Sequence, residues 1–170
     1  MTNYNSVWVT GTPRTGSMWT TNIVREIFIT RAFIVYPDIQ KQHDKQWFNL
    51  YHNKAAKDLD TKNKYVLKTH AMLRPPGIPG SRFIVNIRNP FDICASFREF
   101  MKCDAKRAIG LAKHHLEVIK HYRSFSENEI FFLRYEEIEN KPIESVLNVS
   151  KFLDAEINQD AALKISEKFN

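Results

Sequence analysis

Short β-rich runs with apolar centres alternate along this chain with longer segments of helical periodicity, and this alternation restricts the fold more than any other feature. Strands that read as continuous apolar runs occur in parallel sheets that helices cover on both faces. The runs predicted as strands are 6–10, 32–36, 64–70, 82–88 and 130–135. The segments predicted as helices are 17–31, 42–58, 90–102, 105–124, 142–153 and 158–168. The sequence predicts an α/β fold in a single domain, 1–170, with a central parallel sheet of four or five strands flanked by helices. We expect it to be P-loop-like because Gly11 and Gly16, after the first strand, have the spacing of a nucleotide phosphate loop.

Glycine and proline mark the boundaries between these segments. The sequence RPPGIPG, residues 74–80, breaks both regular structures and predicts a loop. Asn89 followed by Pro90 predicts a helix start, because proline is favoured at the first helical position. In sheets of this kind, ligands bind beyond the carboxyl ends of the strands. The residues that follow each predicted strand are therefore the candidates for function.

The composition predicts a soluble, intracellular protein. Of 170 residues, 43% are hydrophobic and 26% are charged, which suits a globular chain with a packed core. No apolar run approaches the ~20 residues of a membrane helix. The first residues lack the basic and apolar regions of a signal peptide. We expect a cytoplasmic protein without a membrane partner, in which Cys94 and Cys103 are reduced thiols.

The net charge of +6 indicates an anionic ligand. A basic chain can bind nucleic acid, acidic membranes or small phosphates. Here the basic residues are spread along the chain, with no arginine-rich run and no zinc-knuckle pattern. A small polyanion needs only a few of these charges, so we expect a small anionic ligand and no nucleic-acid partner.

The first predicted strand is followed by GTPRTGSMW, residues 11–19, which has the glycine spacing of a nucleotide phosphate loop. Ser17 stands where such a loop has its lysine, and Met18 stands where it has the hydroxyl that binds magnesium. The glycine turns, the amides of a helix start, Arg14 and the Thr15 hydroxyl still suit a phosphate or a sulfate, but hold no metal. The simpler alternative is a glycine-bearing turn without a ligand.

Polar side chains also follow the other predicted strands. Lys68 and His70 fall on the same side of one strand end, which places an ammonium beside an imidazole that can accept a proton. Arg88 ends the next strand and Ser96 lies two helical turns further on, so that both can hold one phosphate. Tyr135 follows the last strand and can pack on a nucleobase. Each residue also has an ordinary alternative role, and only together do they predict a pocket for an anionic nucleotide beside a general base.

Four of these stretches, in the same order, resemble the sulfotransferases that use 3′-phosphoadenosine 5′-phosphosulfate (PAPS), most closely the cytosolic small-molecule branch in a shortened form. TPRTGSMW resembles the family's 5′-phosphosulfate loop, T-[YF]-P-K-S-G-T-x-W, and LKTH resembles its strand ending in the catalytic histidine. VNIRNPFDICASF resembles its 3′-phosphate motif, R-N-x-x-D-x-x-x-S, and LRYEEIENKPIESVLNVSKFL resembles its Y-E-D-[LM]-x-x-x-P segment. The four motifs span about residues 7–153.

The resemblance implies sulfuryl transfer from PAPS, as donor, to a hydroxyl of a small-molecule acceptor, with 3′,5′-adenosine bisphosphate (PAP) as product and no metal. It implies that His70 is the general base and that Arg14 and Lys68 act on the transferring group. The residues implied to bind the donor are Arg14, Thr15, Gly16, Ser17, Met18, Trp19, Arg88, Ser96 and Tyr135. Members of the family need no magnesium, which explains a phosphate loop without its lysine and metal ligand. A homodimer is an open possibility.

The resemblance has one clear gap, because the chain ends without the family's late R-K-G loop over the 3′-phosphate. Other cations are candidates to replace that loop, namely Arg98, Lys102, Lys106 and Arg107. Two alternatives stay open. A P-loop kinase or NTPase is favoured by the glycine spacing, and a non-catalytic nucleotide-binding relative is favoured by the missing loop.

Overall fold

The computed structural model describes residues 4–37, 53–55, 57, 58, 60, 62–73, 80–126 and 128–169. Most of the helix predicted over 42–58, and most of the loop predicted over 74–80, lie outside these residues. No helix within the described ranges is long and apolar enough to cross a membrane.

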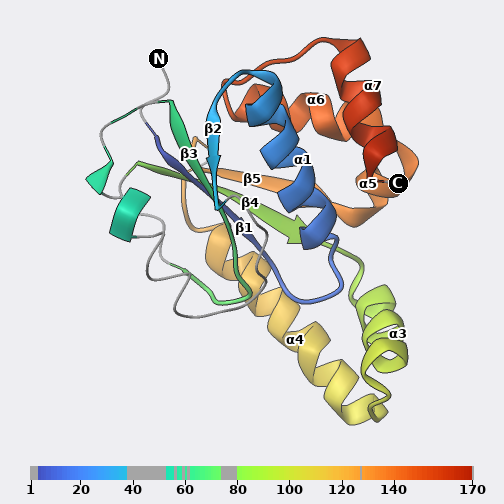
Figure 1. Ribbon diagram of the computed structural model, residues 1–170. Helices are drawn as coiled ribbons and strands as arrows, with labels where there is room; N and C mark the ends of the chain where they lie inside the picture. Colours follow the sequence, from blue (N-terminus) through green and yellow to red (C-terminus); the bar gives the residue numbers. More distant parts are fainter. Residues whose placement is uncertain are drawn as a thin grey trace.

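The described strands form one parallel sheet, as the apolar runs predict (Figure 1). They are β1 (Ser6–Thr10), β2 (Ile34–Tyr36), β3 (Asn63–Lys68), β4 (Ser81–Ile87) and β5 (Ile130–Arg134). Their order across the sheet is β2-β3-β1-β4-β5, and every neighbouring pair is parallel. All five residues of β1 are buried because β1 lies at the centre, between β3 and β4. The predicted fold class is confirmed.

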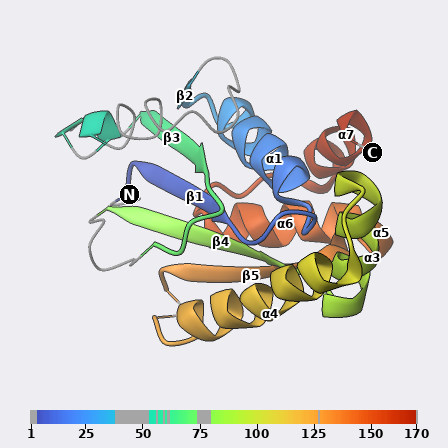
Figure 2. The same ribbon diagram turned by 90° about the horizontal axis from the view of Figure 1, so that it is seen from below.

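Helices cover both faces of this sheet (Figure 2). The described helices are α1 (Ser17–Thr30), α3 (Pro90–Met101), α4 (Ala105–Tyr122), α5 (Tyr135–Asn140), α6 (Pro142–Phe152) and α7 (Gln159–Lys168), of which α3 lies beyond the sheet and packs against α4 (Figure 1). Side chains alternate along a strand, so β1 feeds two cores. Val7 and Val9 join the cluster under α1, α6 and α7, whereas Trp8 joins the cluster that contains Tyr122 of α4.

Two boundaries differ from the sequence prediction in ways that affect the site. β3 ends at Lys68, not at residue 70, because its neighbour β1 turns away at Gly11 and the last register pair is Val9 with Lys68. Tyr135 does not end β5 but begins the short helix α5, which the sequence analysis did not predict. The two glutamates in the first turn of α5 favour a helix start through the helix dipole.

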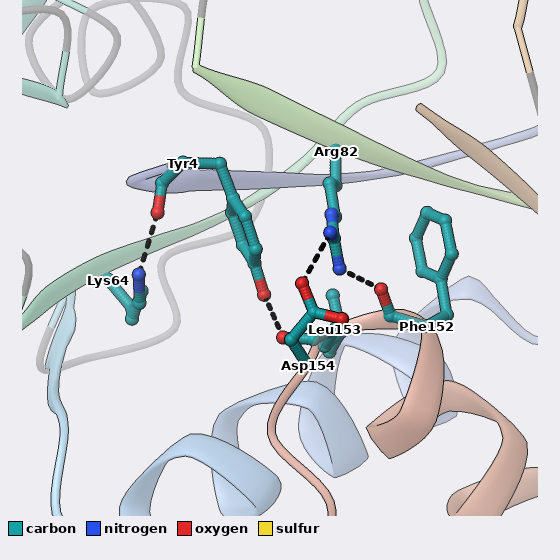
Figure 3. Close-up of polar contacts among 6 residues, drawn as sticks. All are labelled: Tyr4, Lys64, Arg82, Phe152, Leu153 and Asp154. Carbon is teal, nitrogen blue, oxygen red and sulfur yellow. Dashed lines mark hydrogen bonds and ion pairs between the residues drawn. The ribbon is translucent and has the colours of Figure 1, made fainter. Parts of the chain in front are cut away.

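A polar cluster fastens the amino-terminal edge of the sheet to the end of α6 (Figure 3). The Tyr4 hydroxyl donates a hydrogen bond to the Leu153 carbonyl. The Arg82 guanidinium donates to the Phe152 carbonyl and pairs with Asp154 at 2.6 Å. Carbonyls at a helix end lack partners within the helix, so these contacts satisfy groups that would otherwise need water. The cluster stabilises the end of the domain opposite to the strand ends where the site lies.

Lys64 lies in the same cluster and is wholly buried. Its Nζ donates to the Tyr4 carbonyl (Figure 3), at a distance of 2.6 Å. The same Nζ lies 4.6 Å from the Tyr4 ring centroid and 5.1 Å from that of Phe33. Burial, and then the charge of Arg82, lower the pKa of Lys64 from 10.5 to about 8. Burial disfavours the ammonium because it removes water from the charge.

We expect the stability of the fold to rise with pH between about pH 8 and pH 9.5. In this range the folded protein has released the Lys64 proton while the unfolded chain still binds it, so unfolding takes up a proton. One proton gives at most about 1.4 kcal/mol per pH unit. Urea unfolding of the wild type and of Lys64→Met across this range measures the effect. Equal pH slopes in the two proteins would show that Lys64 does not titrate as described.

Candidate functional site

The candidate site lies where β1, β3, β4 and β5 end, at the carboxyl edge of the sheet. The loop 11–16 follows β1 and leads into α1, and Thr69 and His70 follow β3. Arg88 and Asn89 follow β4 and lead into α3. Tyr135 follows β5 and begins α5. Since parallel strands end at a common edge, these four segments, which are distant in sequence, meet there.

The loop 11–16 has the backbone that its glycines predict. Gly11 and Gly16 have positive φ angles of 134° and 85°, and Arg14 between them has a φ of 72°. The Thr15 hydroxyl donates to the Thr12 carbonyl at 2.8 Å, which closes the loop from inside. Gly16 precedes α1 and no side chain caps that helix start. The first amides of α1 therefore face the site as hydrogen-bond donors suited to an anion.

Arg14, Ser96, Arg88 and Tyr135 are brought together from four elements. Arg14 Nε donates to Ser96 Oγ at 2.9 Å, and Arg88 Nη1 donates to the Arg14 carbonyl at 3.1 Å. The Arg88 guanidinium carbon lies 3.8 Å from the centroid of the Tyr135 ring, which supports it from one side. Among the described residues, the buried Arg88 Nε has no hydrogen-bond partner. A ligand oxygen would satisfy this donor, which otherwise carries a desolvation cost.

His70 is held by the loop after β1. Its Nδ1 lies 2.6 Å from the Gly11 carbonyl. A carbonyl can only accept a hydrogen bond, so Nδ1 carries a proton and Nε2 is the basic nitrogen of the neutral ring. This contact fixes the orientation of the imidazole, which is the arrangement that a general base requires.

Lys68, at the end of β3, contacts the first turn of α1. Its Nζ lies 3.0 Å from the sulfur of Met18, and burial lowers its pKa. The strand-alternation argument placed Lys68 and His70 side by side, but His70 lies beyond the end of β3 in a bend. The two side chains are therefore held at the site by different contacts. Lys68 contacts Met18, and His70 is hydrogen-bonded to the Gly11 carbonyl.

The other residues that the sequence analysis expects to bind the anionic nucleotide lie in the loop 11–16 and in the first turn of α1. Thr15 and Ser17 are buried, and Trp19 packs partly against the core cluster under α1. The four cations named as candidates to contact the 3′-phosphate in place of the R-K-G loop are all exposed on α3, α4 and the turn between them. These are Arg98, Lys102, Lys106 and Arg107.

The sequence analysis missed two polar residues of α4 that support the site, His115 and Tyr122. His115 bonds to the Thr12 hydroxyl at 2.9 Å, and the Arg88 amide donates to its other nitrogen at 3.3 Å. Tyr122, seven residues further along α4, accepts from the Leu73 amide at 3.0 Å. Their helical spacing could have indicated them, because His115 and Tyr122 both lie on the buried face of α4. A polar residue in such a stripe needs a partner.

Comparisons with known proteins agree with this architecture. The profile of the family described as "Sulfotransferase domain" matches residues 5–170. A search of curated proteins by sequence found no match. Mouse sulfotransferase SULT7A1, in a complex with PAP, is similar to this chain with a TM-score of 0.69 at 15% identity, over 99% of this chain and 64% of its own.

Two further solved structures are similar at comparable distance. Retinol dehydratase, in a complex with androsterone and inactive cofactor PAP, has a TM-score of 0.65 at 18% identity, over 97% of this chain and 64% of its own. The sulfotransferase domain of the Synechococcus PCC 7002 olefin synthase has a TM-score of 0.61 at 13% identity, over 97% of this chain and 78% of its own. The chain thus spans 64% of the length of the mouse protein and of retinol dehydratase. At these identities the likeness concerns the fold.

Proposed function

Since the chain belongs to the sulfotransferase domain family, we propose that it transfers the sulfuryl group of PAPS to a hydroxyl of a small-molecule acceptor and releases PAP. The observation that carries the proposal is that the oriented imidazole of His70 lies beside the candidate anion site of the loop 11–16, at the carboxyl edge of the sheet. His70 is bonded to the carbonyl of Gly11 in the same loop that carries Arg14. Binding alone would not need a base in this place, whereas transfer to a hydroxyl does.

The donor is proposed to lie across the ends of β1 and β4. Backbone amides of the loop and of the α1 start bind the 5′-phosphosulfate, with Thr15, Gly16, Ser17 and Met18 forming this part. Arg88 and Ser96 bind the 3′-phosphate, and the unpartnered Arg88 Nε supports this role. Trp19 and Tyr135 are assigned to the adenine, and Tyr135 already lies against Arg88.

The proposed reaction is an in-line displacement at sulfur. A bond forms between the acceptor oxygen and sulfur while the bond from sulfur to the phosphate oxygen breaks. His70 Nε2 takes the acceptor's proton, and Arg14 and Lys68 stabilise the negative charge that grows on the departing oxygen. Lys68 suits this role because its ammonium has lost part of its hydration, so that an anion near it interacts more strongly.

The acceptor is proposed to be a small molecule with a phenol-like hydroxyl. Solved structures of retinol dehydratase, which has this fold, hold androsterone or retinol beside PAP. Both are small molecules with an alcohol hydroxyl, and this supports a small hydroxyl compound as acceptor here, whereas the phenol-like hydroxyl rests on the resemblance of the motifs. An acceptor screen in which simple phenols stay inert while one bulky compound reacts would contradict the proposed phenol-like acceptor.

The first test is a calorimetric titration of the protein with PAP. We expect saturable binding that falls roughly 100-fold or more in Arg88→Ala, because charged hydrogen bonds to the 3′-phosphate are lost. Arg31→Ala is the matched control. It removes the same charge from the far, exposed end of α1 and should leave PAP affinity unchanged.

Titration with ATP and magnesium separates the proposal from a P-loop kinase or NTPase. Tight binding of ATP with magnesium, without binding of PAP, would overturn the sulfotransferase proposal. Binding of PAP without transfer to any hydroxyl acceptor from PAPS would instead favour a non-catalytic relative.

A further inference from the structure

His115 is the one buried group of α4 that contacts both halves of the candidate donor site. Its side chain is wholly buried. One ring nitrogen, Nδ1, lies 2.9 Å from the Thr12 hydroxyl in the loop after β1. The other, Nε2, lies 3.3 Å from the backbone amide of Arg88 after β4. The His115 ring thus contacts both the loop proposed to bind the 5′-phosphosulfate and Arg88, which is proposed to bind the 3′-phosphate.

The hydrogen-bond partners define the tautomer of this ring. The Arg88 amide can only donate, so Nε2 must accept and cannot carry a proton. In the neutral ring Nδ1 then carries the proton and donates to the Thr12 hydroxyl. Burial lowers the pKa of His115, which favours this neutral form. Neither asparagine nor phenylalanine can make both bonds over the same distance.

The two hydrogen bonds of His115 lie just beyond the last paired residues of β1 and β4. The register of β1 with β4 ends at Thr10 and Val85. Beyond that pair β1 turns at Gly11, so no ladder bond sets the distance between the loop and Arg88. The two hydrogen bonds of His115 connect the loop with Arg88 instead. On the other side Arg88 Nη1 reaches the Arg14 carbonyl.

The Thr12 contact extends into the rest of the loop. The Thr12 carbonyl accepts from the Thr15 hydroxyl at 2.8 Å, and both threonines are buried. A shift of Thr12 would therefore move the amides that precede α1. A nucleotide with two anionic groups at a fixed separation needs the loop and Arg88 at a matching separation, and a misfit of about 1 Å is costly.

We propose that His115 is a positioning residue that fixes the spacing between the loop 11–16 and Arg88, and so sets the affinity for a doubly anionic nucleotide. The affinity part rests on the proposed function. The spacing part concerns the protein alone and can be measured without a ligand. The simpler reading is a core histidine whose bonds only stabilise the fold, and the experiment separates the two.

The test compares His115→Phe with His114→Phe. His114 precedes it on the same helix, but its side chain is 41% exposed and its Nδ1 lies 3.4 Å from Glu117 Oε2, a residue of the same helix. Amide hydrogen exchange without ligand should become faster at Arg88 and in the loop 11–16 in His115→Phe, with the β-sheet core unchanged. Unchanged exchange at both places would overturn the proposal.

Titration with PAP then measures the effect on affinity. Loss of two buried hydrogen bonds should weaken PAP binding about tenfold or more in His115→Phe and leave it unchanged in His114→Phe. In turnover, the KM for the donor should rise while the KM for the acceptor stays the same. A purely structural role predicts a lower unfolding midpoint with no change in either affinity or donor KM.

Thr12→Val is a second variant that tests the same contact even if His115→Phe fails to fold. It removes one hydroxyl at nearly constant shape and breaks only the bond to Nδ1. We expect the same direction of change with a smaller effect, about threefold in PAP affinity. Thr12→Val with wild-type exchange and wild-type PAP affinity would contradict the proposal. If the wild type itself fails to bind PAP, the proposed function is wrong, while the exchange experiment still decides whether His115 sets the spacing.

Discussion

Replacing His70 by alanine is expected to reduce sulfuryl transfer at least about 100-fold while PAP affinity stays near the wild-type value. General-base catalysis contributes about 10²–10⁴-fold to a rate, and the variant has no group that takes the acceptor's proton. PAP affinity should survive because the donor contacts are assigned to the loop after β1, to Arg88 and to Ser96. Single-turnover rates with PAPS and a phenol, beside calorimetry with PAP, measure both quantities.

A second variant separates the base from its hydrogen bond to the loop. Asparagine at position 70 can keep a donor near the place of Nδ1, which lies 2.6 Å from the Gly11 carbonyl, but offers no basic nitrogen. We expect His70→Asn to be as inactive as His70→Ala, with the loop less disturbed. His114→Ala, on the exposed face of α4, serves as the control that keeps activity. Wild-type turnover in His70→Asn would show that another group takes the proton.

The architecture was predictable because its signals are local and redundant. The middle residues of β1 and β4, 7–9 and 83–85, are apolar without alternation, and a parallel sheet covered on both faces buries such strands. The start of α3 followed from Asn89 and Pro90, and the structure shows Asn89 capping the helix by accepting from the Phe91 amide at 2.9 Å. Each of these features depends on residues adjacent in sequence, which pattern reasoning can use.

The missed features depend on contacts between distant residues. β3 looked long enough to include His70, but its end is set by Gly11 of another strand. His115 read as one residue of an amphipathic helix, and its partners Thr12 and Arg88 lie 103 and 27 positions away. Periodicity shows that a side chain is buried but not which groups it meets. A buried polar side chain in an apolar stripe was the only warning.

Gly11→Ala is expected to destabilise the fold by roughly 3 kcal/mol or more and to abolish PAP binding. A φ of 134° is a conformation that residues with a side chain rarely adopt, and such strain alone costs about 1–3 kcal/mol. An added Cβ would also lie 2.6 Å from the Asn86 carbonyl oxygen, which belongs to the buried strand β4. Neither backbone can yield without moving the loop away from the strand ends, and the same carbonyl group of Gly11 holds His70.

Gly110→Ala provides the matched control for this substitution, with an effect of opposite sign. Gly110 lies in α4, and a Cβ added there would meet nothing within 4 Å. Alanine in a helix is better than glycine by about 0.5–1 kcal/mol, so this variant should gain stability and keep PAP affinity. Urea unfolding and PAP calorimetry on both variants make the comparison. A Gly11→Ala protein with wild-type stability would mean that the chain does not turn at Gly11 against β4, and the geometry assigned to the loop and to His70 would then be wrong.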